Sequence, residues 1–230
     1  MIWDMRLRME KQKEKSMKIS WNMVRILLVG ILAVAMLGGC STDTSVKTYL
    51  QALLDASYKN DSTAFVKMKL GTAEDAQALY ERGIDTGVSV FCGRIGASDD
   101  YKGEFRATYM DLLSKVRYTV DEASKQSDGS YIVTVSYEKM NVFKPALELH
   151  QSNVAAMTEE WAKAPESAPS KEDMMKQVIL EFRNSMETVL ADVQYSEPQT
   201  MNIRIELADN IYTPNADDIA ALETALFDVE

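Results

Sequence analysis

The chain has 230 residues, of which 46% are hydrophobic and 26% are charged, a composition typical of one globular domain with a leader. Residues 1–40 hold seven of the 25 Lys and Arg residues but three of the 35 Asp and Glu residues, so residues 41–230 carry a net charge of −14. Such an acidic surface repels phosphate backbones and no basic stripe offsets it, which argues against nucleic-acid binding.

The first feature along the chain is an apolar run from Ile26 to Met36 that contains no charged residue and follows Lys18 and Arg25. A helix that spans a membrane needs about 20 such residues, whereas a run of about 10–14 after basic residues is typical of a signal peptide. The pattern therefore predicts a secretory signal. Met17 is an alternative start to Met1, and both choices leave the signal intact.

The run ends in Leu37-Gly38-Gly39-Cys40, which resembles the lipobox of bacterial lipoproteins. The resemblance implies that the Cys40 thiol receives a diacylglyceryl group and that the signal is cut just before it. Two acyl chains hold a protein stably on a membrane. We therefore expect a leader and signal peptide over 1–39, a lipidated cysteine and short tether over 40–45, and one domain over 46–230, on the extracytoplasmic face. The alternative is a core helix that ends in a buried cysteine.

The first part of the expected domain is helical. Apolar residues recur at helical spacing between Val46 and Leu54, a second short helix is expected from Asp61 or Ser62 to Leu70, and Thr72 with Asp75 approximates a capping box. That box predicts a third helix to about Arg82. Glycines between Gly87 and Gly96 predict a separating stretch, after which a helix is expected over 98–116.

The period then changes to two, which is typical of strands. Tyr118 and Val120 alternate with polar residues, the turn signal Ser127-Asp128-Gly129 follows, and a second alternating run extends from Tyr131 to Tyr137. These features predict a β-hairpin. A further strand is expected over 201–207.

Helices are expected around that last strand. One begins near Pro145 and runs to Lys163, a second follows the capping residue Ser170 and carries apolar residues to Leu190, and a C-terminal helix follows Asn215. The order predicts an α+β fold that is rich in helix, with a small antiparallel sheet of about three to four strands packed against helices.

Three segments resemble uncharacterised lipoproteins that are common in Gram-positive gut bacteria. They are "VKTYLQALLDASYKNDSTAFVKM", "YTVDEASKQSDGSYIVTVSYEKMNVF" and "YTPNADDIAALETALFDVE". Members of this group carry domains of unknown function, some with folds like cystatin or the nuclear-transport-factor cone. The resemblance implies a lipoprotein domain of that kind and supplies no functional residues.

Candidate site residues are few. His150 is the single histidine, so it is either a core-edge residue or the centre of any triad or metal site, and Cys92 is either a small buried apolar residue or a reactive thiol. Trp161 is either a binding aromatic or a cover over the core. The methionine stripe formed by Met174, Met175 and Met186 is expected to be helical core, with an adaptable ligand groove as the alternative.

Pairs of acidic residues occur at Asp99-Asp100, Glu159-Glu160 and Asp217-Asp218. None has the alternating spacing of a calcium loop, so we interpret them as solvated or helix-capping charges. Two carboxylates that meet in the fold could still support glycoside chemistry. No catalytic residue, metal or cofactor is predicted.

The resulting hypothesis is a membrane-anchored lipoprotein that binds a ligand or a protein without catalysis; an envelope hydrolase with a carboxylate site is the alternative. Three structural observations discriminate between these functions. Carboxylates, or His150 with Cys92, converging in a cleft favour an enzyme. A closed apolar cavity favours a small ligand, and an exposed apolar surface favours a protein partner.

Overall fold

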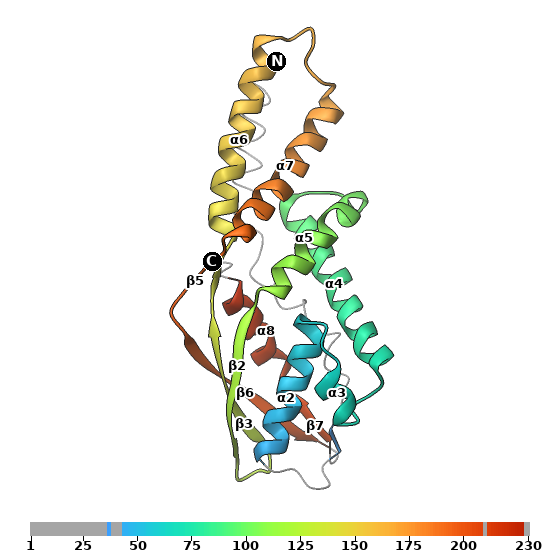
Figure 1. The fold of residues 1–230 in the computed structure, drawn as a ribbon, viewed down its shortest axis with the longest axis vertical. Coiled ribbons are helices and arrows are strands. Elements are labelled where there is room, and N and C mark those ends of the chain that lie inside the picture. Colours follow the sequence, from blue (N-terminus) through green and yellow to red (C-terminus); the bar gives the residue numbers. More distant parts are fainter. Residues whose placement is uncertain (1–35, 38–42, 209–210, 228–230) are drawn as a thin grey trace.

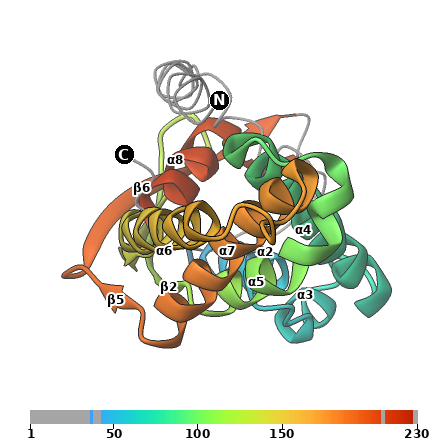
Figure 2. The same cartoon turned by 90° about the horizontal axis from the view of Figure 1, so that it is seen from above.

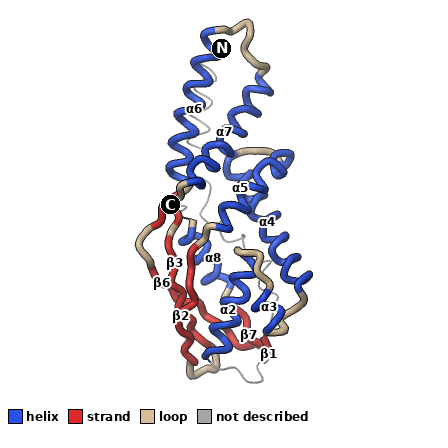
Figure 3. The backbone as a smooth tube through the Cα atoms, viewed as in Figure 1, coloured by secondary structure: helices blue, strands red, loops and turns tan. Residues whose placement is uncertain are grey.

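The computed structural model describes residues 36–37, 43–208 and 211–227, which form a body and a long helical arm (Figure 1). The arm consists of residues 147–181, in which the helices α6 (Phe143–Lys163) and α7 (Lys171–Ala191) rise beyond the rest of the molecule. The body contains all the strands and the remaining helices (Figure 3). None of the described helices is long and apolar enough to cross a membrane.

An antiparallel sheet in the order β1-β7-β6-β3-β2 forms one layer of the body. Its central pair is β3 (Tyr131–Glu138) and β6 (Gln199–Ala208), in register from Tyr131 opposite Ile205 to Tyr137 opposite Gln199. Every second residue of β3 is buried, as the alternating sequence predicts. β2 (Arg117–Lys125) pairs with β3 as the expected hairpin, with a register shift between Val120 and Ala123.

The predicted α+β fold is confirmed, and the sheet has more strands than the sequence indicates. β7 (Ile211–Pro214) pairs with β6, and β1 (Met36–Leu37) pairs with β7 at the edge. A separate two-stranded sheet joins β4 (Met140–Asn141) to β5 (Gln194–Tyr195). These strands have two to four residues, too few for an alternating pattern to be recognised.

Helices cover one face of the sheet in two layers. α2 (Asp43–Tyr58) packs against β2 and β3, and on its other side against α4 (Ala73–Ile95), so Tyr49, Leu50 and Leu53 are all buried. α5 (Lys102–Ser114), which follows a 3₁₀ turn at Asp99–Tyr101, packs against α4. α8 (Ala216–Leu226) lies against β6, and the short helix α3 (Thr63–Lys67) lies beside α2 and α4.

α4 corrects the prediction of a break at Gly83 and of a separating stretch from Gly87 to Gly96. The helix continues through both and ends at Gly96, whose φ of +72° is the left-handed conformation that closes many helices. Its buried residues recur at helical spacing through this region: Tyr80, Ile84, Val88 and Phe91. Tertiary packing of this apolar face outweighs the weak helix propensity of glycine.

Gly87 has a specific packing role within α4. A Cβ atom at this position would overlap the hydroxyl end of Tyr109 from α5, whereas a Cβ at Gly83 or Gly93 would contact nothing within 4 Å. The glycine therefore lets the two helices approach closely. The same glycine that suggests a helix break in the sequence is a packing residue in the fold.

The two ends of the molecule are structurally different. α2 begins at Asp43, at the end of the long axis opposite the tip of the arm (Figure 1). α6 and α7 lie side by side when viewed along that axis (Figure 2). The buried residues of these two helices all lie at the junction with the body, at Ala146, Phe182, Ser185, Met186 and Leu190.

Candidate functional site

The arm has no buried residue between Leu147 and Glu181, although its sequence is rich in large apolar side chains. Leu147 and Met175 are 47% and 57% exposed. Trp161 and Met174 are half-buried, as are Val154, Met157 and Val178. Two helices alone cannot enclose a wide apolar stripe on each of them, since a third element is needed to cover the sides of their seam. The arm therefore presents apolar surface to its surroundings.

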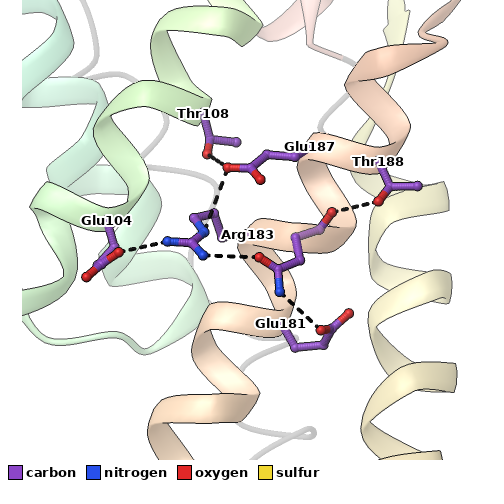
Figure 4. A network of polar contacts seen from close by, with 7 residues as sticks. Glu104, Thr108, Glu181, Arg183, Glu187 and Thr188 are labelled. Atoms are coloured by element: carbon purple, nitrogen blue, oxygen red, sulfur yellow. Dashed lines mark hydrogen bonds and ion pairs between the residues drawn. The ribbon is translucent and has the colours of Figure 1, made fainter.

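Arg183 links the base of the arm to the body through a network of polar contacts (Figure 4). Its Nη1 donates to Glu104 of α5 at 2.7 Å, and its Nε lies 3.7 Å from Oε1 of Glu187. The same Glu187 oxygen accepts a hydrogen bond of 2.9 Å from the Thr108 hydroxyl of α5. One cation thus joins carboxylates on α5 and α7, which fixes the direction of the arm relative to the body.

A cluster of aromatic rings fills the same junction on its apolar side. The His150 ring meets the Phe182 ring edge-on at 5.4 Å, and Phe182 stacks on Phe91 of α4 at 5.8 Å. Phe91 also contacts Phe105 and Phe143. The arm is therefore attached through ring packing from four helices, together with the Arg183 network.

His150 is a core-edge residue in this cluster. Its Nδ1 is buried without a hydrogen-bond partner, and burial lowers the pKa of the ring, an effect that Glu181 partly opposes. The neutral imidazole is therefore favoured. The apolar rings around it disfavour the charged form of the ring.

Cys92 is buried in α4, as the apolar interpretation predicts. Burial raises the pKa of its thiol, with smaller effects from Lys102 at the start of α5 and from Asp99 in the 3₁₀ turn before it. A thiol with a raised pKa is a poor nucleophile at neutral pH. Neither Cys92 nor His150 is among the groups that shift the pKa of the other, so the structure gives no sign of an activated pair.

The methionine stripe divides between the two parts of the molecule, which corrects the prediction that it is core. Met186 is 1% exposed in the body, whereas Met174 and Met175 lie on the arm with partial or large exposure. These methionines differ in exposure because they lie at different positions along α7, and not because of their spacing in the sequence. Trp161 lies near the tip of the arm and covers no part of the body core.

The acidic pairs occupy helix ends and outer faces. Asp99 and Asp100 form the 3₁₀ turn before α5, and the pair at 159–160 is exposed on α6. Asp218, in the first turn of α8, binds the Arg204 guanidinium at 2.8 and 3.1 Å. Among the described residues, no group of three or more His, Cys, Asp or Glu side chains is arranged to hold a metal ion.

An open groove of about 520 Å³ lies between the turn after α2 and the start of α4. Asn60 and Ser62 line one side, and Glu74, Gln77 and Glu81 line the other. Its wall is mixed, because Ala73 and Ala78 lie among these polar side chains, and the groove is open to solvent. This groove is not the closed apolar cavity that a hydrophobic ligand requires.

Glu223 of α8 is a buried carboxyl group that is not among the residues predicted from the sequence. Its side chain is 7% exposed, and Oε2 has no hydrogen-bond partner; nor has the hydroxyl of the buried Tyr58. Burial raises the pKa of Glu223 well above its usual value. The signal was present, since positions 219, 222, 223 and 226 share one helix face and the other three residues on it are apolar.

The predicted lipidation site lies at the edge of what the structure describes. Leu37 belongs to β1 and pairs with Ile211 of β7. Gly38, Gly39 and Cys40 lie outside the described residues, so lipidation at Cys40 stays a prediction.

No family model matches the chain, and no curated protein matches it. The fold is similar to a crystal structure of the Bacillus subtilis protein YcdA, which is provisionally described as a lipoprotein. The TM-score is 0.53 at 14% identity, over 80% of this chain and 56% of that one, so the chain spans little more than half the length of YcdA. Similarity at this identity shows a shared fold. The resemblance to cystatin-like or cone-shaped domains receives no support from these comparisons.

Proposed function

We propose that the protein is a lipoprotein, anchored by Cys40 on the extracytoplasmic face of the membrane, that binds a protein partner through its arm and carries out no catalysis. The leader supports the anchor, because its apolar run is short and ends in a lipobox-like segment. The fold shared with YcdA agrees with a lipoprotein. Two acyl chains supply the membrane affinity that no described helix can supply.

The exposed apolar surface of the arm carries the proposal of a protein partner. Leu147 and Met175 are among the most exposed large hydrophobic residues of the described chain, and they lie on different arm helices. Methionine and tryptophan on a helix pair provide an adaptable, largely apolar contact surface. The stripe suits a partner that presents an apolar helix, which would complete the packing that two helices leave open.

The position of the arm agrees with this function. α2, which begins three residues after Cys40, starts at the end of the body opposite the arm (Figure 1), and a helix as long as α6 extends about 30 Å. An anchored molecule would therefore hold its apolar surface away from the membrane, toward partners elsewhere in the envelope.

The carboxyl groups of the described chain give less support to a hydrolase. A glycosidase needs two carboxyl groups on either side of a substrate. The pKa of Glu223 responds to burial and to Tyr58 and not to a second carboxylate. The open groove beside α4 carries exposed carboxylates without a buried nucleophile or base.

The anchor is tested by replacing each cysteine in turn and fractionating cells. We expect Cys40→Ala to move the protein from the membrane to the soluble fraction and to abolish incorporation of a lipid label. Cys92→Ala is the control and should leave both unchanged, since Cys92 is buried in the body. Membrane retention of the Cys40→Ala protein at the level of the parent would refute the lipid anchor.

The binding surface is tested by photo-crosslinking in cells. A photoreactive residue replaces Leu147 or Met175 on the arm, and Val66 or Leu207 on the body; all four are exposed large apolar side chains. The proposal predicts a discrete adduct from the arm positions and none from the two body positions. Adducts of equal yield at all four positions, or at the body positions alone, would show that the arm is not the binding surface.

A further inference from the structure

α8 is attached to the body differently at its two ends. At its start, the Asn215 amide N–H donates to the Arg204 carbonyl at 2.8 Å, and Asp218 binds both the backbone and the guanidinium of Arg204. The second half of the helix carries Leu222, Glu223 and Leu226, which face the core. The polar contact described between this half and another element is that of the Glu223 carboxyl with the Tyr58 hydroxyl of α2. The start of α8 is thus fixed by charged contacts, and its second half mainly by burial.

Glu223 is the ionisable residue in that buried half. No cation is among the groups that shift its pKa. Tyr58 of α2 is the titratable side chain that acts on it, and Tyr58 in turn is influenced by Tyr109 of α5 and Tyr118 of β2. Lys59, which follows Tyr58 in the chain, pairs with Asp55 at 3.1 Å and lies over the Tyr118 ring.

This environment favours the neutral acid over the carboxylate. An ionised group that is buried without a partner loses its hydration and gains nothing in exchange. Burial accordingly raises the pKa of Glu223 well above its usual value, while its interaction with Tyr58 lowers it to a smaller extent. The unpartnered Oε2 and the unpartnered Tyr58 hydroxyl give the same indication from geometry.

We propose that protonation of Glu223 latches the second half of α8 onto the body, so that this half opens when the surrounding medium becomes more alkaline. The start of the helix stays attached through Asp218 and Arg204, which makes it the hinge. The regulated element is α8, the helix that covers β6. This regulation does not depend on partner binding by the arm.

The sign of the effect follows from proton linkage. Glu223 is neutral in the closed form and has an ordinary carboxyl pKa in the open form, so opening releases a proton. The opening equilibrium therefore rises by up to about tenfold per pH unit between the ordinary pKa of about 4.5 and the raised pKa of the closed form. Below that window the latch is closed and insensitive to pH.

Hydrogen exchange of the domain comprising residues 41–230 tests the proposal. Protection factors of the amides in 221–227, corrected for intrinsic exchange, are measured from about pH 5 to about pH 8. They should fall with rising pH in the parent protein and stay constant in Glu223→Gln, which has the same shape and no charge. Asp217→Asn, which removes an exposed acid from the same helix, is the control and should keep the slope of the parent.

Two results would overturn the proposal. One is protection of 221–227 that does not change with pH in the parent, or that changes no more than protection in α4. The other is an unchanged slope in Glu223→Gln. If that variant does not fold, NMR titration of the Glu223 carboxyl carbon in the parent decides the matter, and a midpoint at the usual value for glutamate would refute the latch.

Discussion

The body and the arm are built from similar apolar residues but use them differently. In the body, Tyr49, Phe105 and Ile203 have no solvent exposure, because the sheet and two layers of helices enclose them. In the arm, side chains of the same kind stay half-exposed along the whole of 147–181. Apolar composition therefore does not decide burial; the number of elements that pack around a side chain does.

The body and the arm therefore have different roles. Burial of apolar area at about 25 cal/mol per Å² makes the body the source of stability. The arm contributes little to folding and keeps an apolar surface at a cost in solubility, which is typical of a binding surface.

The largest contrast is expected between two leucines of the same helical hairpin. Leu190 is 1% exposed in the body, whereas Leu147 is 47% exposed on the arm. Leu190→Ala should lower the free energy of unfolding by about 3 kcal/mol, and Leu147→Ala by less than about 0.5 kcal/mol. Urea denaturation of the domain comprising residues 41–230 measures both values. Equal losses would mean that the arm is part of the core.

The close approach of α4 and α5 gives the next largest effect. Gly87→Ala should destabilise the protein by about 1–3 kcal/mol, because the new methyl group overlaps Tyr109. Gly83→Ala in the same helix meets open space and should stabilise it by up to about 1 kcal/mol. Thermal unfolding of the two variants is sufficient to test this. A stabilised Gly87→Ala protein would contradict the packing role of that glycine.

Loss of the polar contacts between the arm and the body should have a moderate and local effect on stability. Arg183→Gln removes the contacts with Glu104 and Glu187, and we expect a loss of about 1–2 kcal/mol together with faster hydrogen exchange at the base of α7. Arg117→Gln, which breaks an exposed pair with Glu138, is the control and should leave exchange at the base of α7 unchanged. If both variants exchange like the parent at the junction, the aromatic cluster alone holds the arm.

The smallest expected effect is an acid-dependent loss of stability at the junction. Burial lowers the pKa of His150, so the unfolded chain binds more protons than the folded chain once the pH falls below the ordinary value of about 6.5. Stability is therefore lost as the pH falls from there through the lowered pKa of the folded state. His150→Gln should reduce that loss in urea denaturation at two pH values, and an unchanged pH dependence would contradict it.

Much of the fold could be predicted because local chemistry and tertiary structure agree. The capping box of Thr72 and Asp75 starts α4, Ser170 caps α7, and Asn215 caps α8. The hairpin follows its period of two and turns at Gly129, whose φ is +89°. At these positions a side chain satisfies backbone groups of its own segment, so the sequence contains the whole interaction.

The rest depends on contacts between distant segments. The continuation of α4 through Gly87 depends on Tyr109, and β7 exists because β6 offers it a partner. Met175 and Met186 have the same helical pattern but differ in what surrounds them. The arm could not be predicted for the same reason, since helical periodicity indicates which face is apolar and not whether anything covers it.

Hydrogen exchange shows whether the arm binds a protein in the envelope, when exchange of the anchored protein in native membranes is compared with exchange of the purified domain comprising residues 41–230. If the arm binds an envelope protein, peptides from 147–181 will be protected more strongly in the membranes, while body peptides that contain Ile203 or Leu112 will exchange at the same rate in both samples. Equal exchange of the arm in both samples, or protection confined to the body, would contradict the claim that the arm is the binding surface.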